Sequence, residues 1–201
     1  MAVDLAVELV RGCSHADVMF LRAGGVTTPV STDPVAVALG EAQGATGGGP
    51  CIMAATEEEL VVANDLTADQ RWPAFAGQAC DLGVYSVVAY QLFLHRNDDD
   101  RFGALNLYGR SPDAFDEESI GLGEVFAAQC AASLAFAIAH EGAQAALQSR
   151  DVIGQAKGIL MERHQLTAAD AFDLLRTQSQ QQNVKLRDLA QGVAETGSLP
   201  R

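Results

Sequence analysis

Apolar and polar positions alternate in short runs over residues 1–140, as in strands separated by turns and short helices. The runs richest in β-branched and aromatic residues predict strands at 16–21, 26–31, 60–62, 84–94 and 102–108. Helices are predicted at 4–10, at 74–82 and from Asp33-Pro34 through Glu41, because aspartate caps a helix and proline fits its first turn. The glycine-rich segment 44–50 is predicted to be a loop, and residues 97–100 a hairpin tip.

From residue 116 the pattern changes to a long amphipathic helix, with no proline before Pro200. Its apolar face is marked at helical spacing by Ile120, Phe126, Cys130, Leu134, Ala137 and Ile138. If it continues through Leu147 to His164, it is about 70 Å long, with Gly142 and Ser149 as the points where a kink would fall. A helix of that length does not stand alone in water. A second copy of the chain, paired along a parallel helical seam, is therefore expected.

Residues 150–164 carry different chemistry on the two sides of this helix. At 100° per residue, one side holds the core positions Val152, Ile153, Ala156, Ile159 and Leu160. The opposite side holds Arg150, Gly154, Lys157, Gly158 and Met161. A glycine inside a helix costs roughly 1 kcal/mol relative to alanine, and its advantage is the close approach of another backbone or a ligand. This second side is therefore predicted to be a contact surface.

Two shorter helices are predicted to close the chain. Thr167 and Asp170 have the spacing of a capping box, and the helix that they start is predicted to bury Ala168, Ala171, Phe172, Leu175 and Ser179. Asn183 is predicted to cap the last helix, which ends at Gly197 and buries Leu186, Leu189, Ala190 and Val193. So few apolar groups make a marginal core, so support from the dimeric seam is expected.

The charge distribution separates the same two regions. The chain carries 13 basic and 26 acidic residues, for a net charge of −13. Residues 1–149 hold six arginines against twenty acids, whereas residues 150–201 hold seven cations against six acids. Both lysines of the chain, Lys157 and Lys185, lie in the second region. A tail of this charge on an acidic body is compatible with polyanion binding by the tail, and also with a balanced helical surface.

Composition and motifs argue against several classes of protein. No apolar run is expected to reach the roughly 20 residues of a membrane span, and the acidic N-terminal segment has no basic start, so a cytoplasmic protein is expected. The cysteines are widely separated, which predicts reduced thiols and no metal site. The three aspartates at 98–100 lack the ligand spacing of a calcium loop. No nucleophile or phosphate-loop motif is present, so neither catalysis nor a cofactor is expected.

Residues 150–196 resemble the ANTAR domain, a three-helix RNA-binding antiterminator module. The resemblance rests on the run 153–161, Ile-Gly-Gln-Ala-Lys-Gly-Ile-Leu-Met, followed by Ala171-Phe172, Leu175-Arg176, Ser179, Asn183 and Lys185-Leu186. It implies binding to paired RNA hairpins in leader transcripts, which prevents a terminator from forming. Because proteins read RNA mainly at unpaired bases, the implied contact residues are Arg150, Gly154, Lys157, Gly158, Met161, Arg176, Ser179, Asn183 and Lys185. Helix capping is the alternative role for the last three.

Residues 1–140 resemble the GAF domains that precede ANTAR domains in actinobacterial proteins, through Gly49-Pro-Cys51, Asp65-Leu66, Arg71-Trp-Pro73, Gly83-Val84 and Ala104-Leu-Asn-Leu-Tyr108. The resemblance implies an α/β GAF sensor domain at 1–140, with a central antiparallel sheet flanked by helices. A helical linker at 141–149 and an all-α ANTAR domain at 150–201 follow, joined to it by the long helix. The implied protein is a homodimeric antitermination regulator, and whether its GAF domain holds a small-molecule ligand is left open. The alternative is a ligand-sensing GAF dimer whose helical tail contacts protein or DNA.

Overall fold

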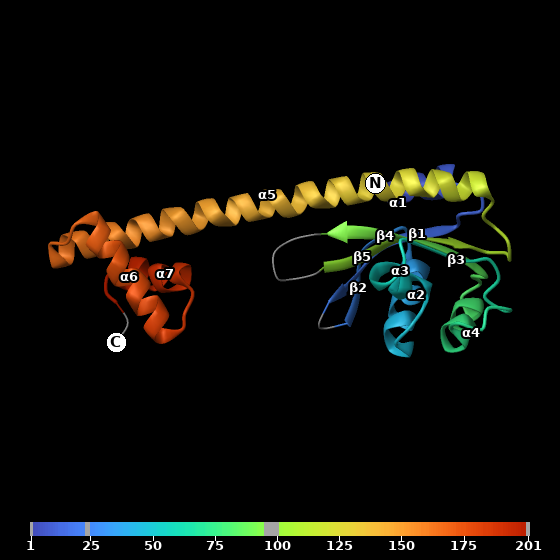
Figure 1. The fold of residues 1–201 in the computed structure, drawn as a ribbon, viewed down its shortest axis with the longest axis horizontal. Helices are drawn as coiled ribbons and strands as arrows, with labels where there is room; N and C mark the ends of the chain where they lie inside the picture. The colour runs from blue at the N-terminus through green and yellow to red at the C-terminus, as the bar shows by residue number, and fades with distance from the viewer. Residues whose placement is uncertain (1, 23–24, 95–100, 200–201) are drawn as a thin grey trace. The chain divides into compact units, whose positions relative to one another are not determined.

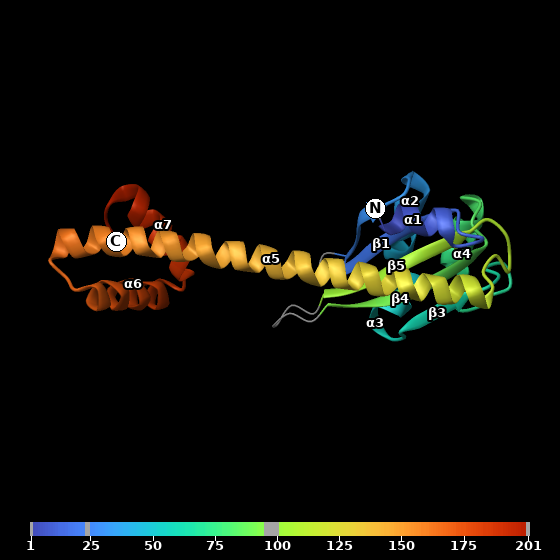
Figure 2. The same cartoon turned by 90° about the horizontal axis from the view of Figure 1, so that it is seen from above.

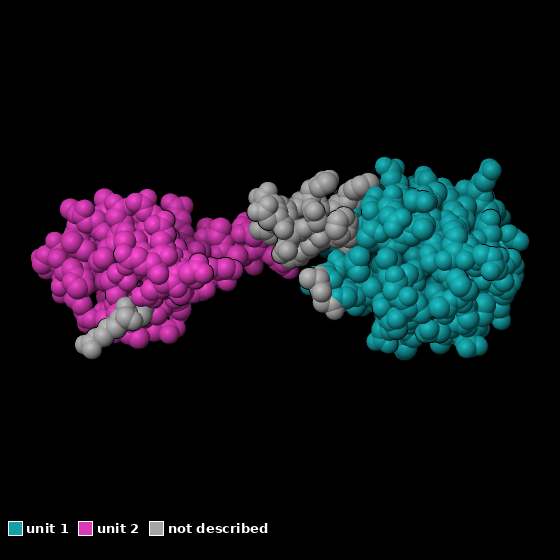
Figure 3. Space-filling model, turned by 60° about the horizontal axis from the view of Figure 1, so that its bottom comes forward, with its two compact units in different colours: residues 1–136 teal, residues 137–201 magenta. Residues whose placement is uncertain are grey.

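The chain forms two compact units, residues Met1–Phe136 and Ala137–Arg201, shown in teal and magenta in Figure 3. The computed structural model describes residues 2–22, 25–94 and 101–199. Helix α5 (Glu117–His164) contributes to both units and runs for 48 residues without a break. The predicted long helix is thus continuous from the first unit to the second.

A five-stranded antiparallel sheet forms the centre of the first unit (Figure 1). The strand order is β2 (Gly25–Ser31), β1 (His15–Arg22), β5 (Arg101–Gly109), β4 (Ser86–Leu94) and β3 (Leu60–Ala63). β1 pairs with β2, and β4 pairs with β5, as the two predicted antiparallel pairs. The predicted tip of the second hairpin, residues 97–100, lies outside the described residues.

Helices cover both faces of this sheet (Figures 1 and 2). α1 (Ala2–Leu9) and the beginning of α5 lie on one face, while α2 (Pro34–Thr46), α3 (Pro50–Thr56) and α4 (Pro73–Asp81) lie on the other. The loop predicted at 44–50 is shorter than expected, because α2 continues to Thr46 and α3 begins at Pro50. α3 has only 7 residues, too few to show a helical period.

The start of α5 packs closely on the sheet. The Tyr90 hydroxyl on β4 donates a 2.8 Å hydrogen bond to the backbone carbonyl of Ile120. A Cβ atom at Gly123 would overlap the phenol ring of Tyr90, so this close approach requires glycine. Arg11, just after α1, forms 2.9 Å ion pairs with Asp116 and Glu118 at the start of α5. The first turns of α5 are therefore fixed to the first unit.

The second unit packs the end of α5 against α6 (Ala168–Gln182) and α7 (Leu186–Thr196). Its buried core is apolar and consists of Ala156, Leu160, Ala171, Leu175, Leu189, Ala190 and Val193. The Thr167 cap is confirmed, since its hydroxyl accepts from the backbone N–H of Asp170 at 3.2 Å. The predicted burial of Ala168 and Phe172 is wrong, because α6 turns Ala171 and Leu175 inward and leaves those two residues exposed.

The expectation that no segment would be apolar enough to span a membrane is wrong for α5. By length and composition alone, this helix meets that criterion among the described residues, with a mean hydropathy of 1.6 over its most apolar stretch. Its many alanines raise the hydropathy without forming a run of large apolar side chains. Only 17% of that stretch is buried in the chain, so most of it is available to an external partner.

Candidate RNA-binding surface

Three of the predicted contact residues line one groove of the second unit. The groove lies between α5 and α6, has a volume of about 540 Å³ and includes Arg150, Gly154 and Lys157. Phe172 of α6 also lines it, and the Lys157 Nζ lies 5.9 Å from the centroid of the Phe172 ring. Two cations, a helical glycine and an aromatic ring are thus gathered in one hollow; we call it the α5–α6 groove.

No internal contact accounts for the glycines of this helix face. A Cβ atom added at Gly154 or Gly158 would have no neighbouring atom within 4 Å, whereas one at Gly123 would overlap Tyr90. The helix gives up roughly 1 kcal/mol of helix propensity at each glycine relative to alanine. Nothing among the described residues of the unit offsets this loss, so internal packing does not account for glycine at positions 154 and 158.

Two other predicted contact residues differ in their surroundings. Met161 is partly buried against the core of the second unit, so its thioether is less exposed than the helical wheel predicts. Arg176 is exposed on α6 and forms a 2.9 Å ion pair with Asp173, one turn away. Exposed ion pairs of this kind contribute little to stability. Breaking the pair so that Arg176 can bind a phosphate would therefore cost little free energy.

The remaining three lie at the connection between α6 and α7. Asn183 has a left-handed backbone, with φ of 52°, and ends α6. The prediction that it starts α7 is therefore wrong, and Lys185 occupies that N-cap position without a capping side-chain bond. The Ser179 hydroxyl donates to the backbone carbonyl of Val184 at 2.6 Å. Ser179 and Asn183 thus shape the turn, while Lys185 is exposed.

Sequence reasoning missed a buried chain of polar side chains in the first unit. Asp17 on β1 is fully buried and accepts hydrogen bonds from Asn106 Nδ2 at 2.6 Å and from the Tyr108 hydroxyl at 2.8 Å. The Tyr108 oxygen lies 3.5 Å from Cys51 Sγ, and the Gln43 side chain accepts from the Cys51 backbone N–H at 2.9 Å. This polar chain, from Asn106 to Gln43, connects the sheet to α2 and α3.

Burial dominates the chemistry of this polar chain. It raises the pKa of Asp17 to about 7, although the hydrogen bonds from Asn106 and Tyr108 act to lower it. It also raises the pKa of the Cys51 thiol to about 12, so the thiol is protonated and a poor nucleophile. Gln43 Nε2 and Asn106 Oδ1 are buried without a hydrogen-bond partner. The only sequence signal for this chain is the presence of Asp17 and Asn106 within apolar strands.

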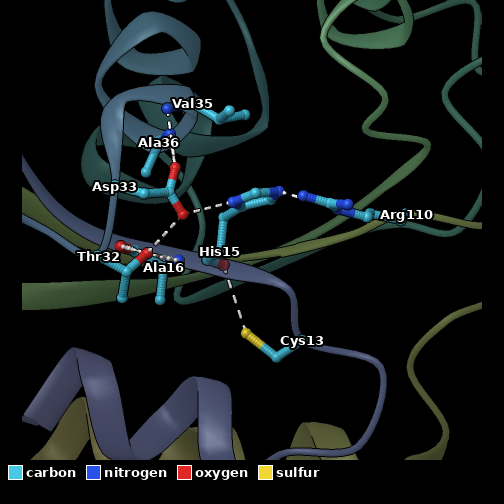
Figure 4. Close-up of polar contacts among 8 residues, drawn as sticks. All are labelled: Cys13, His15, Ala16, Thr32, Asp33, Val35, Ala36 and Arg110. Carbon is cyan, nitrogen blue, oxygen red and sulfur yellow. Dashed lines mark hydrogen bonds and ion pairs between the residues drawn. The ribbon is translucent and has the colours of Figure 1, made fainter.

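The buried His15 on β1 contacts Asp33, which caps α2, and Arg110, which follows β5 (Figure 4). Its Nδ1 lies 2.6 Å from the carboxylate of Asp33, and its Nε2 accepts from Arg110 Nε at 3.2 Å. Because arginine can only donate, the ring hydrogen is on Nδ1 and points to Asp33. Burial disfavours the charged form of Asp33, but hydrogen bonds from His15, Ala36 and Val35 outweigh it and lower the pKa. Because both ring nitrogens form hydrogen bonds, His15 links β1 to the start of α2 and has no nitrogen free to act as a base.

Metal-binding clusters and buried thiols were two possible sources of chemistry in the described part of the chain. Over residues 2–22, 25–94 and 101–199, no cluster of three or more His, Cys, Asp or Glu side chains could hold a metal ion. Burial raises the pKa of the Cys13 thiol to about 12, as it does for Cys51. Neither of these thiols is an activated nucleophile.

Two domain families match the chain. The GAF domain family matches residues 1–135 and the ANTAR domain family matches residues 141–193. No curated protein sequence matches.

Among solved structures, a domain assigned to a two-component sensor histidine kinase protein from Sinorhizobium meliloti 1021 is 16% identical, with a TM-score of 0.52, over 72% of this chain and 91% of that one. A type II free methionine-R-sulfoxide reductase from Thermoplasma acidophilum is 15% identical, with a TM-score of 0.45, over 65% of this chain and 84% of that one. An RNA-binding Light-Oxygen-Voltage receptor is 24% identical, with a TM-score of 0.27, over 90% of this chain and 47% of that one.

The family matches agree with the architecture. The GAF match covers more than half of the chain and coincides with the antiparallel sheet and its flanking helices. The ANTAR match covers the end of α5, all of α6 and most of α7. GAF domains are sensor domains, and ANTAR domains are RNA-binding antiterminator domains. The chain is therefore a GAF–ANTAR protein, in which a GAF domain is followed by an ANTAR domain.

Proposed function

We propose that the protein is a transcription antitermination regulator that binds paired RNA hairpins in leader transcripts. We place the GAF domain at 1–140, the helical linker at 141–149 and the ANTAR domain at 150–201. The observation that carries the proposal is the α5–α6 groove, in which Arg150 and Lys157 lie beside Gly154. Basic side chains neutralise phosphates, and a glycine surface lets an RNA loop approach closely. The other contact residues proposed are Gly158, Met161, Arg176, Ser179, Asn183 and Lys185.

The GAF domain regulates this binding and catalyses no reaction. Helix α5 provides the connection, because its first turns are bonded to the sheet through Tyr90 and its last turns carry Lys157. A signal that changes the packing of the sheet therefore acts on the helix that binds RNA. Turnover of a substrate by residues 1–140 would contradict this assignment.

A second copy of the chain completes the protein as a homodimer. Val125, Phe136 and Leu147 on α5 follow one another at intervals of eleven residues and are 64%, 73% and 61% exposed. An eleven-residue repeat keeps apolar side chains on one helix face and suits a helical seam. Leu5 and Leu9 on α1 are also exposed and are four residues apart. Burial against a second copy removes these side chains from water.

Light scattering at micromolar concentration tests the homodimer, because a constitutive dimer has twice the 21.1 kDa mass of the chain. A monomer at that concentration would exclude it. The dimer seam also accounts for the apolar character of α5 without a membrane, and we place the protein in the cytoplasm. Retention in a membrane fraction after cell lysis would contradict that location.

A gel-shift comparison tests the proposed function. The probes are a pool of RNAs, each with two adjacent hairpins whose loops are randomised, and duplex DNA of equal length. We expect the protein to select a subset of the hairpin pairs and to bind this subset more tightly than the duplex DNA. Equal or tighter binding to duplex DNA, or no selection from the RNA pool, would favour the alternative of a GAF dimer whose tail contacts DNA or protein.

A further inference from the structure

We propose that the α5–α6 groove is a slot for one unpaired RNA base, which stacks on the Phe172 ring while Arg150 and Lys157 bind the adjoining phosphates. This inference rests on the proposed function and adds Phe172, which sequence reasoning placed in the core. Its starting observation is that Phe172 lines the groove and is 36% exposed, whereas Ala171 and Leu175 of the same helix are buried.

The position of Phe172 on α6 is one that packing alone does not explain. Ala171 and Leu175 fill the core side of the helix and are fully buried. Phe172 lies about 100° around the helix from Ala171, on the side that faces the groove and Lys157. An aromatic ring left partly in water beside a cation offers a flat surface on which a base can stack.

The groove has room for such a base. Its volume of about 540 Å³ lies within the range of small-ligand sites, roughly 300–1,000 Å³. Gly154 leaves space beside the ring, since a Cβ atom at this position would meet nothing within 4 Å. Ser149 and Ala146, both small, line the same hollow. A large side chain on α5 would fill the space that a base needs.

Charge distinguishes a nucleic-acid base from other flat or apolar occupants. The lining of the groove contains Arg150 and Lys157 and no acidic residue, although the chain carries twice as many acids as bases. Flexible lysine and arginine side chains reach phosphates beside a stacked base. An apolar peptide or a lipid tail would gain nothing from these two cations, whereas a nucleotide uses both the ring and the charge.

A second groove in the same unit serves as an internal comparison. It lies between α5 and α7, has a volume of about 430 Å³ and has no aromatic residue in its lining. Its one cation, Arg187, forms a 3.1 Å ion pair with Asp188, which also lines it. This groove therefore lacks both the stacking surface and the unbalanced positive charge, so Arg187→Ala is the matched control for the slot.

The test uses the full-length protein and a double-hairpin RNA selected by the parent from the randomised pool. Phe172→Leu keeps an apolar side chain but removes the flat ring, so we expect it to weaken binding by about five- to a hundredfold. Its salt dependence should equal that of the parent, because no charge is lost. Phe172→Trp preserves a stacking surface and should bind within about threefold of the parent. Arg187→Ala should also bind within about threefold of the parent.

Abasic sites introduced one at a time into the loops locate the stacked base. At one loop position, the abasic RNA should bind the parent and Phe172→Leu equally, because the interaction that distinguishes them is already lost. If the parent binds the selected RNA and Phe172→Leu binds it equally tightly, the base slot is wrong while RNA binding stands. If Phe172→Trp reduces the RNA affinity as much as Phe172→Leu does, the proposed base slot is also contradicted. If the parent selects no hairpin RNA, the proposed function itself is wrong.

Discussion

The two units keep their polar chemistry in opposite places. In the first unit, Asp17, Asn106 and Gln43 are fully buried and tie the sheet to its helices. In the second unit, the buried core is wholly apolar, and the cations and the Phe172 ring face water or a groove. A buried titratable group responds to changes in packing, whereas exposed cations respond to a partner in solution. The GAF domain therefore keeps its polar groups in its interior, whereas the ANTAR domain presents its cations and an aromatic ring at its surface.

The sizes of the two cores explain why they differ in this way. Burial of a carboxyl group carries a free-energy penalty, which a large sheet with helices on both faces can offset through its apolar burial. Among its described residues, 137–199, the second unit buries seven apolar residues fully or nearly so. A core of this size contributes little to the free energy of folding. The desolvation penalty of a buried polar group would exceed that contribution, so the functional groups of the second unit lie on its surface.

The largest expected effect is the loss of the second core. Leu160→Ala removes a fully buried side chain of that core and should destabilise the second unit by about 2–5 kcal/mol. Circular dichroism during thermal unfolding should show the loss of helix from this unit. Val184→Ala, at a site that is 39% exposed, is the control and should change stability by less than about 0.5 kcal/mol. Equal destabilisation by both variants would contradict a small, separate core.

A pH titration of stability tests the buried carboxyl of the first unit. The pKa of Asp17 is about 7 in the folded state and about 3.9 in an unfolded chain. The folded state therefore retains this proton to higher pH, and the contribution of Asp17 to the free energy of unfolding is greatest below about pH 4 and falls as pH rises to about 7. Asp17→Asn should remove this decline, which amounts to a few kcal/mol at most.

Trp72, the single tryptophan of the chain, reports this unfolding, since it is buried in the first unit. Urea titrations followed by its fluorescence at several pH values give the free energy of unfolding for the parent and Asp17→Asn. Parallel curves for the two proteins between pH 4 and pH 7 would mean that Asp17 does not hold a proton in the folded state.

A smaller effect, on binding rather than folding, is expected from Gly158→Leu. The added side chain extends into open space and raises helix propensity, so the fold should be retained. Its bulk should keep an RNA loop away from the helix and reduce the affinity for a selected hairpin pair by at least about tenfold. Unchanged affinity in this variant would show that RNA does not approach the glycines.

Much of this architecture was predictable from local sequence patterns. The long apolar period after residue 116 predicted α5, and the Asp33-Pro34 start predicted the cap of α2, where the Asp33 carboxylate accepts from the backbone N–H of Val35. These elements depend on residues close together in sequence. Helix α3 was missed because a segment of 7 residues after a glycine-rich run has no detectable period.

The functional groups were harder to predict because they depend on tertiary contacts. Phe172 was assigned to the core together with Ala171 and Leu175, but α6 buries those two residues and leaves Phe172 36% exposed. Asp17 and Asn106 are 89 residues apart in sequence and meet only because β1 pairs with β5. Asn183 has the side chain of a helix cap, but its left-handed backbone makes it the end of α6.

Lys157→Ala tests the central claim that the α5–α6 groove binds RNA. Lys157 lies in the groove and outside the core cluster, so the variant should keep the circular dichroism spectrum and the dimer mass of the parent. Its affinity for a selected hairpin pair should fall several-fold, and the salt dependence should become shallower by a little under one unit for the lost phosphate contact. Arg187→Ala removes a cation from the groove between α5 and α7. It should leave both the RNA affinity and its salt dependence close to those of the parent. A folded, dimeric Lys157→Ala protein that binds the RNA as tightly as the parent at every salt concentration would contradict the account.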